Sequence, residues 1–288
     1  MHEVIIIGSG PAGMAASLQL KRSGIGFLLL EKKTSGTLLK NAGRVENYLG
    51  FNAVTGVGLL KTFKRHIMHH NIRPILEEVT FMDYEETDER FKVQTNKTIY
   101  YAKRVLVASG TAPKRLDVAN RLESLVSYEL PLNFKKNLQE VAIIGAGDAA
   151  FDYAITLAEK HVVHIFNRGK TIKALPSLKK LVLQNKNISY RENLRLDGIE
   201  EEGSRLRLKF NAKTADSTEV DVDFLIIAIG REAQKVYYSS NVLKREKQLI
   251  QNKLLFLAGD VKNEFYRQVV LATADGIRAA MQIYHEFL

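Results

Sequence analysis

The chain has 288 residues, and not one of them is cysteine. Disulfides, thiolate nucleophiles, and metal or iron–sulfur sites built on sulfur are therefore excluded. Long apolar runs are also missing: no stretch reaches about 18 residues, so we expect no transmembrane helix and no membrane partner. The first residues show neither the basic segment nor the cleavage site of a secretory signal, which predicts a cytoplasmic protein.

Acidic residues are outnumbered by basic ones, 32 to 42, which gives a formal net charge of +10. The excess is concentrated between residues 160 and 195, where nine Lys and Arg accompany a single acid, Glu192. Such a basic surface is compatible with simple solvation, with binding of a phosphorylated cofactor, and with docking of an acidic protein. No DNA- or RNA-binding motif is present, so we expect no nucleic-acid partner.

One pattern of strand, glycine turn, helix and strand occurs twice, over residues 3–31 and again over residues 140–166, with helices predicted at about 11–23 and 148–160. Two such units predict an α/β fold with two doubly wound, Rossmann-like, three-layer dinucleotide-binding domains. The domain boundaries are predicted near residues 112–116 and 231–234, so that the second domain is inserted into the first. We expect residues 1–112 and 234–288 to form the first domain and residues 116–231 the second. A strand at 254–258 and a helix at about 268–287 would complete the first sheet.

The first glycine turn reads Gly8-Ser9-Gly10-Pro11-Ala12-Gly13. Its glycines allow a tight turn, a close approach of backbone to pyrophosphate, and close helix–strand packing. The N-terminus of the helix adds free N–H groups and a positive dipole end for phosphate. Glu31 follows about 20 residues later, at the end of the next strand, where a carboxylate can accept hydrogen bonds from ribose hydroxyls. This context predicts a dinucleotide site; the alternative is a glycine turn that merely packs a helix.

The second glycine turn reads Gly145-Ala146-Gly147-Asp148-Ala149-Ala150, with alanine in the third glycine position. The strand after it ends at Asn167 and Arg168, without an acid. An acid would repel a ribose 2′-phosphate, whereas arginine or lysine would pair with it. The sequence therefore favours NADPH over NADH; the alternative is a scaffold that has lost its nucleotide.

A third group of residues follows a buried strand: Ala258-Gly259-Asp260, then Arg267-Gln268-Val269. With the two turns, and with Val45-Glu46-Asn47-Tyr48, Ala108-Ser109-Gly110-Thr111 and Ala228-Ile229-Gly230, it occurs in an order and spacing that resemble the low-molecular-weight thioredoxin reductases. The resemblance covers nearly the whole chain.

The resemblance implies FAD on the first domain, NADPH on the second, and a homodimer. For FAD it places the pyrophosphate at turn residues 8–13, the adenosine ribose at Glu31, the flavin near Asn47, and the ribityl chain at Asp260. The full set of candidate FAD residues is Gly8, Ser9, Gly10, Pro11, Ala12, Gly13, Glu31, Lys32, Asn47, Val79, Gly110, Asp260, Arg267, Gln268 and Val269. The candidate NADPH residues are Gly145, Gly147, Asp148, Ala149, Asn167, Arg168, Lys173 and Gly230.

The chain departs from this family where the family has its Cys-x-x-Cys pair. Glu129 and Leu132 stand there instead, and neither can exchange electrons with a flavin. Reduction of thioredoxin by the family's route is therefore excluded. In this respect the chain is similar to the thioredoxin-reductase-type ferredoxin–NADP reductases, whose acceptors are ferredoxin or flavodoxin. It lacks their C-terminal extension, because it stops at Glu286-Phe287-Leu288, so we expect a flavin face that is open or covered by a partner subunit.

Three functions remain open. The leading one is an FAD-dependent NAD(P)H oxidoreductase that passes electrons to a non-disulfide acceptor, for which an acidic ferredoxin or flavodoxin is the leading candidate. The others are a flavoprotein reduced by a protein donor and a non-enzymatic flavin-binding partner. Hydride transfer between the rings needs no side-chain acid or base, so no catalytic residue is assigned. His66 and His70 are four apart on a predicted helix, but no further ligand completes a site, and we expect no bound metal.

Overall fold

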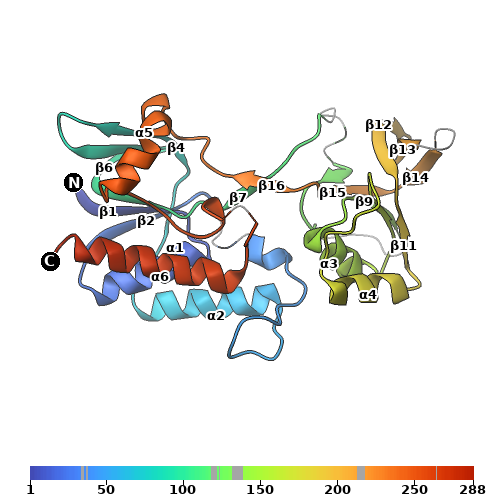
Figure 1. The fold of residues 1–288 in the computed structure, drawn as a ribbon, viewed down its shortest axis with the longest axis horizontal. Helices are drawn as coiled ribbons and strands as arrows, with labels where there is room; N and C mark the ends of the chain where they lie inside the picture. The colour runs from blue at the N-terminus through green and yellow to red at the C-terminus, as the bar shows by residue number, and fades with distance from the viewer. Residues whose placement is uncertain are drawn as a thin grey trace. The chain divides into compact units, whose positions relative to one another are not determined.

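The computed structural model describes residues 1–33, 36, 38–117, 122, 124–131, 139–212, 218–263 and 265–288. The chain divides into two compact units, each with its own sheet and helices (Figure 1). Unit 1 comprises Met1–Lys40, Val45–Ala112 and Glu232–Leu288; unit 2 comprises Asn41–Arg44 and Pro113–Arg231. Two short strands, β7 (Thr111–Pro113) and β16 (Arg231–Ala233), pair where the chain passes from one unit to the other.

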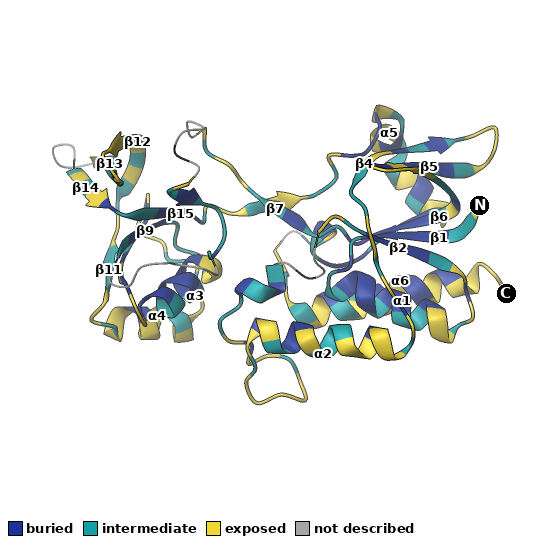
Figure 2. Ribbon diagram, turned by 180° about the vertical axis from the view of Figure 1, so that it is seen from behind, coloured by how far each residue is buried: buried dark blue, intermediate teal, exposed yellow. Residues whose placement is uncertain are grey.

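Unit 1 is built on a mixed sheet in the order β3-β2-β1-β6-β5-β4, with β17 also paired to β6. Strands β3, β2, β1, β6 and β17 run parallel to one another, so their carboxyl ends share one edge, whereas β5 is antiparallel to both β6 and β4. The strands are β1 (His2–Ile7), β2 (Phe27–Glu31), β3 (Ile75–Leu76), β4 (Val79–Glu85), β5 (Arg90–Thr95), β6 (Ile99–Val107) and β17 (Leu255–Leu257). Their apolar runs explain the placement: β1, β2 and β6 are buried in the middle of the layers (dark blue in Figure 2).

Helices α1, α2 and α6 lie together on one side of this sheet, and α5 lies with β4 on the other (Figure 1). The helices are α1 (Pro11–Arg22), α2 (Gly56–His69), α5 (Ser240–Gln251) and α6 (Val269–His285), with short 3-10 helices η1 (Leu38–Asn41) and η3 (Gly259–Val261). Gly276 lets α6 approach α1 closely, because a Cβ there would overlap the carbonyl of Ala12. No described helix combines the length and apolar character needed to span a bilayer.

Unit 2 has a fully parallel sheet in the order β11-β10-β9-β15-β8. Its strands are β8 (Val126–Ser127), β9 (Glu140–Ile144), β10 (Val162–Phe166), β11 (Ile188–Arg191) and β15 (Phe224–Ile227). Helices α3 (Asp148–Leu157) and α4 (Pro176–Gln184) pack on one face. An antiparallel sheet of β12 (Leu194–Glu202), β13 (Arg205–Ala212) and β14 (Thr218–Val222) covers the other, which completes three layers.

The predicted α/β class with two Rossmann-like units is confirmed by this architecture. Two elements differ from the sequence-based expectation. The helix predicted to reach residue 160 ends at Leu157, whose carbonyl accepts the N–H groups of Lys160 and His161 in a closing turn. The polar stretch after residue 231 contains α5, whose first turn is capped by the Ser239 side chain and whose apolar side, Val242 and Leu249, is buried.

Candidate functional site

Turn 1 (residues 8–13) sits at the carboxyl end of β1, between β2 and β6. The Gly8 N–H donates to the Leu30 carbonyl at 2.8 Å, and the Ala108 N–H donates to the Ile7 carbonyl at 2.8 Å. Gly8 has φ +101°, and a Cβ there would overlap the Ala108 carbonyl oxygen. A Cβ at Gly13 would likewise overlap the Gly8 carbonyl. Both glycines are thus required by the backbone packing of strand, turn and helix.

Gly10 has a different role in turn 1. It is the N-cap of α1, no side chain caps the helix, and Pro11 occupies its first turn. A Cβ at Gly10 would meet nothing within 4 Å, so the space in front of the helix N-terminus is open. Uncapped N–H groups facing open space are the ordinary setting for a bound phosphate.

A carboxylate and a buried hydroxyl lie at turn 1. The Ser9 N–H donates to the Glu31 carboxylate at 2.7 Å, which holds this carboxylate beside the turn. The Ser9 hydroxyl is buried and has no hydrogen-bond partner among the described residues, an unsatisfied group that a ligand would satisfy. Lys32 forms an ion pair with Glu78, the residue before Val79, so these predicted residues lie at the same end of β2. The residues present therefore fit a dinucleotide.

The remaining predicted FAD residues come from distant parts of unit 1. Gly259 packs against Ala12 of turn 1, which brings η3 and Asp260 to the start of α1. Gly110, with φ +68°, follows β6 and borders open space. The Asn47 side chain donates to that of Gln268 at 2.8 Å, although the two are 221 residues apart.

The last of the predicted FAD residues lie at the N-terminus of α6. Arg267 donates through Nε to the Asn263 carbonyl at 3.0 Å, and Val269 is the first residue of the helix. The fold therefore gathers the third predicted group of residues at the N-terminal ends of α1 and α6.

Turn 2 (residues 145–150) repeats the contacts of turn 1 inside unit 2. The Gly145 N–H donates to the Phe166 carbonyl at 3.0 Å, and the Ala228 N–H donates to the Ile144 carbonyl at 2.8 Å. Gly145 has φ +138°, and a Cβ there would overlap the Ala228 carbonyl, as at Gly8. Gly147 caps α3 and borders open space. The backbone arrangement of strand, glycine turn and helix seen at turn 1 is therefore repeated at turn 2.

Three further predicted residues border turn 2. Asp148 accepts the Leu175 N–H at 2.8 Å, so its carboxylate ties the start of α3 to that of α4. Ala149 is exposed on the first turn of α3. Gly230, with φ +114°, accepts the Lys114 N–H at 2.9 Å at the base of the β7–β16 pair.

Turn 1 and turn 2 differ at the end of the strand that follows the glycine turn, β2 in unit 1 and β10 in unit 2. By their hydrogen bonds, Leu30 corresponds to Phe166, and so Glu31 corresponds to Asn167. The Asn167 side chain turns inward, donating to the Thr171 carbonyl at 3.1 Å and to the Tyr190 hydroxyl at 2.9 Å. Asn167 thus organises the loop that follows rather than offering a carboxylate to a ribose.

That loop, the basic loop (residues 167–173), carries three exposed cations. They are Arg168, Lys170 and Lys173. The Lys173 N–H donates to the Ala146 carbonyl at 2.8 Å, which folds the loop back onto turn 2. None of the three cations forms an ion pair within the part of the chain that the structure describes.

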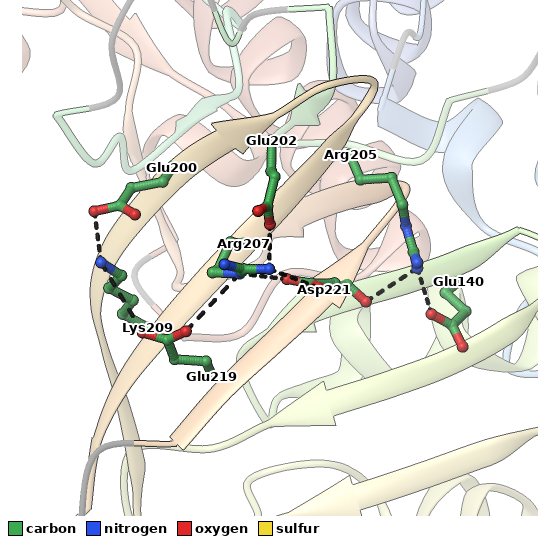
Figure 3. Close-up of polar contacts among 8 residues, drawn as sticks. All are labelled: Glu140, Glu200, Glu202, Arg205, Arg207, Lys209, Glu219 and Asp221. Atoms are coloured by element: carbon green, nitrogen blue, oxygen red, sulfur yellow. Dashed lines mark hydrogen bonds and ion pairs between the residues drawn. The ribbon is translucent and has the colours of Figure 1, made fainter.

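The opposite arrangement occurs on the antiparallel sheet of the same unit (Figure 3). Arg207 of β13 contacts Asp221 at 2.8 Å and also pairs with Glu202, and Lys209 contacts Glu200 at 2.7 Å. Arg205 contacts Glu140 at 2.5 Å and Asp223 at 3.1 Å. Every cation of this charge ladder is matched to a carboxylate. The unmatched charge of the basic loop is therefore a local feature, suited to an external anion.

Glu129, which stands in place of a family cysteine, belongs to an ion pair. Its carboxylate contacts Arg231 at 3.0 Å and accepts a hydrogen bond from Asn41 at 3.0 Å. Burial, with the nearby Glu129 charge, raises the pKa of Tyr153 to about 12, so this phenol stays neutral. Leu132, the other substituted position, lies outside the described residues. Arg231 and Asn41 thus hold the Glu129 side chain in place.

The histidines of α2 lie close together without forming a metal site. The ring centroids of His66 and His70 are 5.4 Å apart. In the described ranges no three histidine or carboxylate side chains are grouped to hold a metal ion.

The model of the family described as pyridine nucleotide-disulphide oxidoreductase matches residues 2–276. The chain is 29% identical to the thioredoxin reductase of Ureaplasma parvum over 98% of this chain and 95% of that protein. It is 25% identical to a 34.2 kDa protein in the rubredoxin operon of Clostridium pasteurianum, over 97% and 95% of the two chains.

Solved structures resemble the whole chain. The thioredoxin reductase of T. acidophilum superposes with a TM-score of 0.86 at 25% identity, covering 99% of this chain and 98% of that one. The Lactococcus lactis enzyme, in its FR conformation, gives a TM-score of 0.87 at 23% identity with the same coverage. At that identity the second likeness concerns the fold alone.

Proposed function

We propose, from the premise that the chain belongs to the pyridine nucleotide-disulphide oxidoreductase family, that it is an FAD-dependent oxidoreductase that takes a hydride from NADPH and passes electrons to a non-disulfide acceptor. The predicted resemblance to the thioredoxin reductases is confirmed by the relatives and the solved structures. The chain is an oxidoreductase of this family without a redox-active disulfide, because it has no cysteine.

The observation that carries the proposal is a pair of glycine turns that have the same backbone arrangement but are followed by side chains of opposite charge. Turn 1 is followed by the fixed carboxylate of Glu31, which suits the ribose of FAD. Turn 2 is followed by the inward-facing Asn167 and the unmatched cations of the basic loop, which suit a 2′-phosphate and so NADPH.

For FAD, we propose that the N–H groups at the start of α1 and the Ser9 hydroxyl bind the pyrophosphate, and that Glu31 binds the adenosine ribose. Lys32 and Val79 would border the adenosine, and Gly110 and Asp260 the ribityl chain. Asn47, Gln268 and the start of α6 at Arg267 and Val269 would border the flavin ring. Bound FAD would supply hydride acceptance and electron transfer, while the protein excludes water and holds the rings.

For NADPH, we propose that Gly145, Gly147 and Ala149 border the pyrophosphate at the N-terminus of α3, with Asp148 bracing that turn. Arg168 and Lys173 would bind the 2′-phosphate, and Asn167 would hold their loop in shape. Gly230 would border the nicotinamide end.

We further propose an acidic electron carrier as acceptor. Helix α4 exposes Leu183 together with Lys179 and Lys180, which lie four and three residues before it and therefore on the same side of the helix, an apolar side chain flanked by positive charge. Such a surface complements an acidic protein of the ferredoxin or flavodoxin kind. The relative in the rubredoxin operon supports a carrier of this class.

We also propose that the protein acts as a homodimer in the cytoplasm. Helix α6 carries an exposed apolar stripe whose members follow one another at alternating spacings of four and three residues. They are Val270, Ala274, Ile277, Met281 and Tyr284. Such spacing forms a continuous seam that fits the same seam of a second copy. The opposite side of α6, with Ala272, Gly276 and Ile283, is already buried in unit 1.

Anaerobic titration of the purified protein with NADPH, and separately with NADH, tests the function. We expect bound FAD to lose its oxidised absorption with NADPH, and with NADH only at higher concentration. A protein purified without flavin would overturn the proposal. A flavin that neither nucleotide reduces, but a reduced carrier protein does, would establish a flavoprotein fed by a protein donor instead.

A further inference from the structure

We infer that Arg191, at the end of β11, binds the 2′-phosphate of the nucleotide together with Arg168 of the basic loop. This inference rests on the proposed use of NADPH by unit 2. It adds a residue that lies outside the glycine turn and outside the strand that follows it.

The sheet register places Arg191 at the site. Strands β10 and β11 are parallel, and Arg191 is paired with Phe166, the last residue of β10. The carboxyl ends of both strands therefore share one edge, the edge at which α/β sheets bind ligands. The Asn167 N–H donates to the Arg191 carbonyl at 2.9 Å, so the backbone of Arg191 is one hydrogen bond from the basic loop.

The chain after Arg191 stays with this loop. The Asn193 N–H donates to the Gly169 carbonyl at 3.3 Å, and the Leu194 N–H donates to the Asn167 carbonyl at 3.0 Å. Gly169 has no side chain, and a Cβ there would meet nothing within 4 Å. The residue next to Arg168 thus leaves open space on the loop that Arg191 borders.

The Arg191 side chain is exposed and oriented by an aromatic ring. Its guanidinium carbon lies 5.9 Å from the centroid of the Phe166 ring, which is itself buried. Parallel neighbours in register project to the same face of the sheet, which accounts for this contact. A guanidinium held over a ring keeps its edge N–H groups available for an anion.

Charge supports the same role. Arg191 forms no ion pair in the described ranges, and the adjacent acid, Glu192, accepts instead from the Asn193 side chain at 3.4 Å. Four cations, Arg168, Lys170, Lys173 and Arg191, therefore lie on or beside one loop, and none of them forms an ion pair within the described residues. Repulsion among them disfavours this cluster unless an anion enters it, and a planar guanidinium matches phosphate with two parallel hydrogen bonds.

Calorimetric binding of NADP⁺, NAD⁺ and 2′,5′-ADP to the flavin-loaded protein tests the inference. We expect Arg191→Leu to weaken NADP⁺ and 2′,5′-ADP by roughly 10-fold or more, and NAD⁺ by less than about 3-fold. Arg191→Lys should recover part of the loss, because the charge remains and the paired hydrogen bonds do not. Arg195→Leu is the matched control, since this exposed arginine lies four residues on and pairs with Asp197 at 3.5 Å. It should leave all three affinities unchanged.

Two results would overturn the role of Arg191 while leaving NADPH use intact. One is an Arg191→Leu protein that binds NADP⁺ as tightly as the wild type. The other is an equal loss for NADP⁺ and NAD⁺, which would mean contact with the adenine or a role in folding. A wild-type protein that binds neither nucleotide would instead overturn the proposed use of NADPH, and this inference with it.

Discussion

Arg168 is the residue on which we expect the choice of nucleotide to depend most. It follows Asn167 at the end of β10, is exposed, and has no carboxylate partner in the described part of the chain. In unit 1 the corresponding position is Lys32, which pairs with Glu78, and the acid Glu31 precedes it. The same backbone arrangement is therefore followed by the acid Glu31 in unit 1 and by the cation Arg168 in unit 2.

Replacing Arg168 by glutamate should reverse the local preference. We expect the affinity for NADPH to fall by more than about 10-fold, because a carboxylate repels the 2′-phosphate, and that for NADH to change by less than about 3-fold. Steady-state KM values for both nucleotides measure this. Equal losses for the two nucleotides would remove the argument for phosphate recognition.

Asp83 contributes to the stability of the folded protein. Its carboxylate accepts hydrogen bonds from the Ser239 hydroxyl at 2.6 Å and the Asn241 side chain at 3.1 Å, which tie the start of α5 to β4. Burial alone would raise the pKa of Asp83, but these hydrogen bonds outweigh it and lower the pKa. A carboxyl with a lowered folded-state pKa adds stability above its unfolded pKa of about 3.9, and that stability is lost as the pH falls through the folded value.

We therefore expect Asp83→Asn to lower the free energy of unfolding by about 1 kcal/mol at pH 7. The difference from wild type should shrink as the pH falls below about 4, because the wild-type carboxyl then takes up a proton. Urea unfolding curves at several pH values measure it. Asp117→Asn, at an exposed position, serves as the control; a difference that stays constant with pH would contradict the assignment.

At the level of elements, the antiparallel sheet of unit 2 depends on its charge ladder. β13 places Arg205, Arg207 and Lys209 on one face (Figure 3). Arg207 and Lys209 pair with acids of β12 and β14, and Arg205 pairs with Glu140 of β9 and with Asp223. Cross-strand pairs of opposite charge favour this register, whereas removal of a cation leaves like charges facing each other. The ion pairs between the strands therefore help to specify the register in which β12, β13 and β14 pair.

Arg207→Met should lower the melting temperature at low salt by about 1–3 °C, because Glu202, Glu219 and Asp221 lose their shared cation. The difference should diminish in 1 M salt, which screens exposed charges to about 3 Å. Differential scanning calorimetry at both salt concentrations measures it. Arg195→Met, which removes one peripheral pair, should change little; an effect of Arg207→Met that is independent of salt would argue for packing instead.

Helix α5 shows a limit of reading elements from composition. Its residues read as a polar stretch, and only Val242 and Leu249 are buried. The helix is stabilised by its N-cap Ser239, which accepts the Val242 N–H, and by the contact of Ser239 with Asp83. The cap can be recognised in the sequence, but its partner is 156 residues away and cannot.

For the molecule as a whole, assembly is the testable property. The apolar stripe of α6 is exposed, with Ile277 at 42% and Met281 at 49% of full exposure. We expect the double variant Ile277→Lys, Met281→Lys to sediment as a monomer and the wild type as a dimer, because buried like charges oppose pairing. Gln282→Lys adds charge beside the stripe and should leave the dimer intact. A monomeric wild type would refute the proposed seam.

The sequence alone determined the two glycine turns, the α/β class and the absence of a sulfur redox centre, because these depend on local spacing and on composition. Gly8 and Gly145 could be identified in this way, since each needs a positive φ set by its own turn. Only the tertiary structure decided that Asn47 meets Gln268, that Asn167 faces inward, and that Arg191 borders the basic loop. These contacts arise from sheet register and from packing between distant segments, which no local pattern encodes.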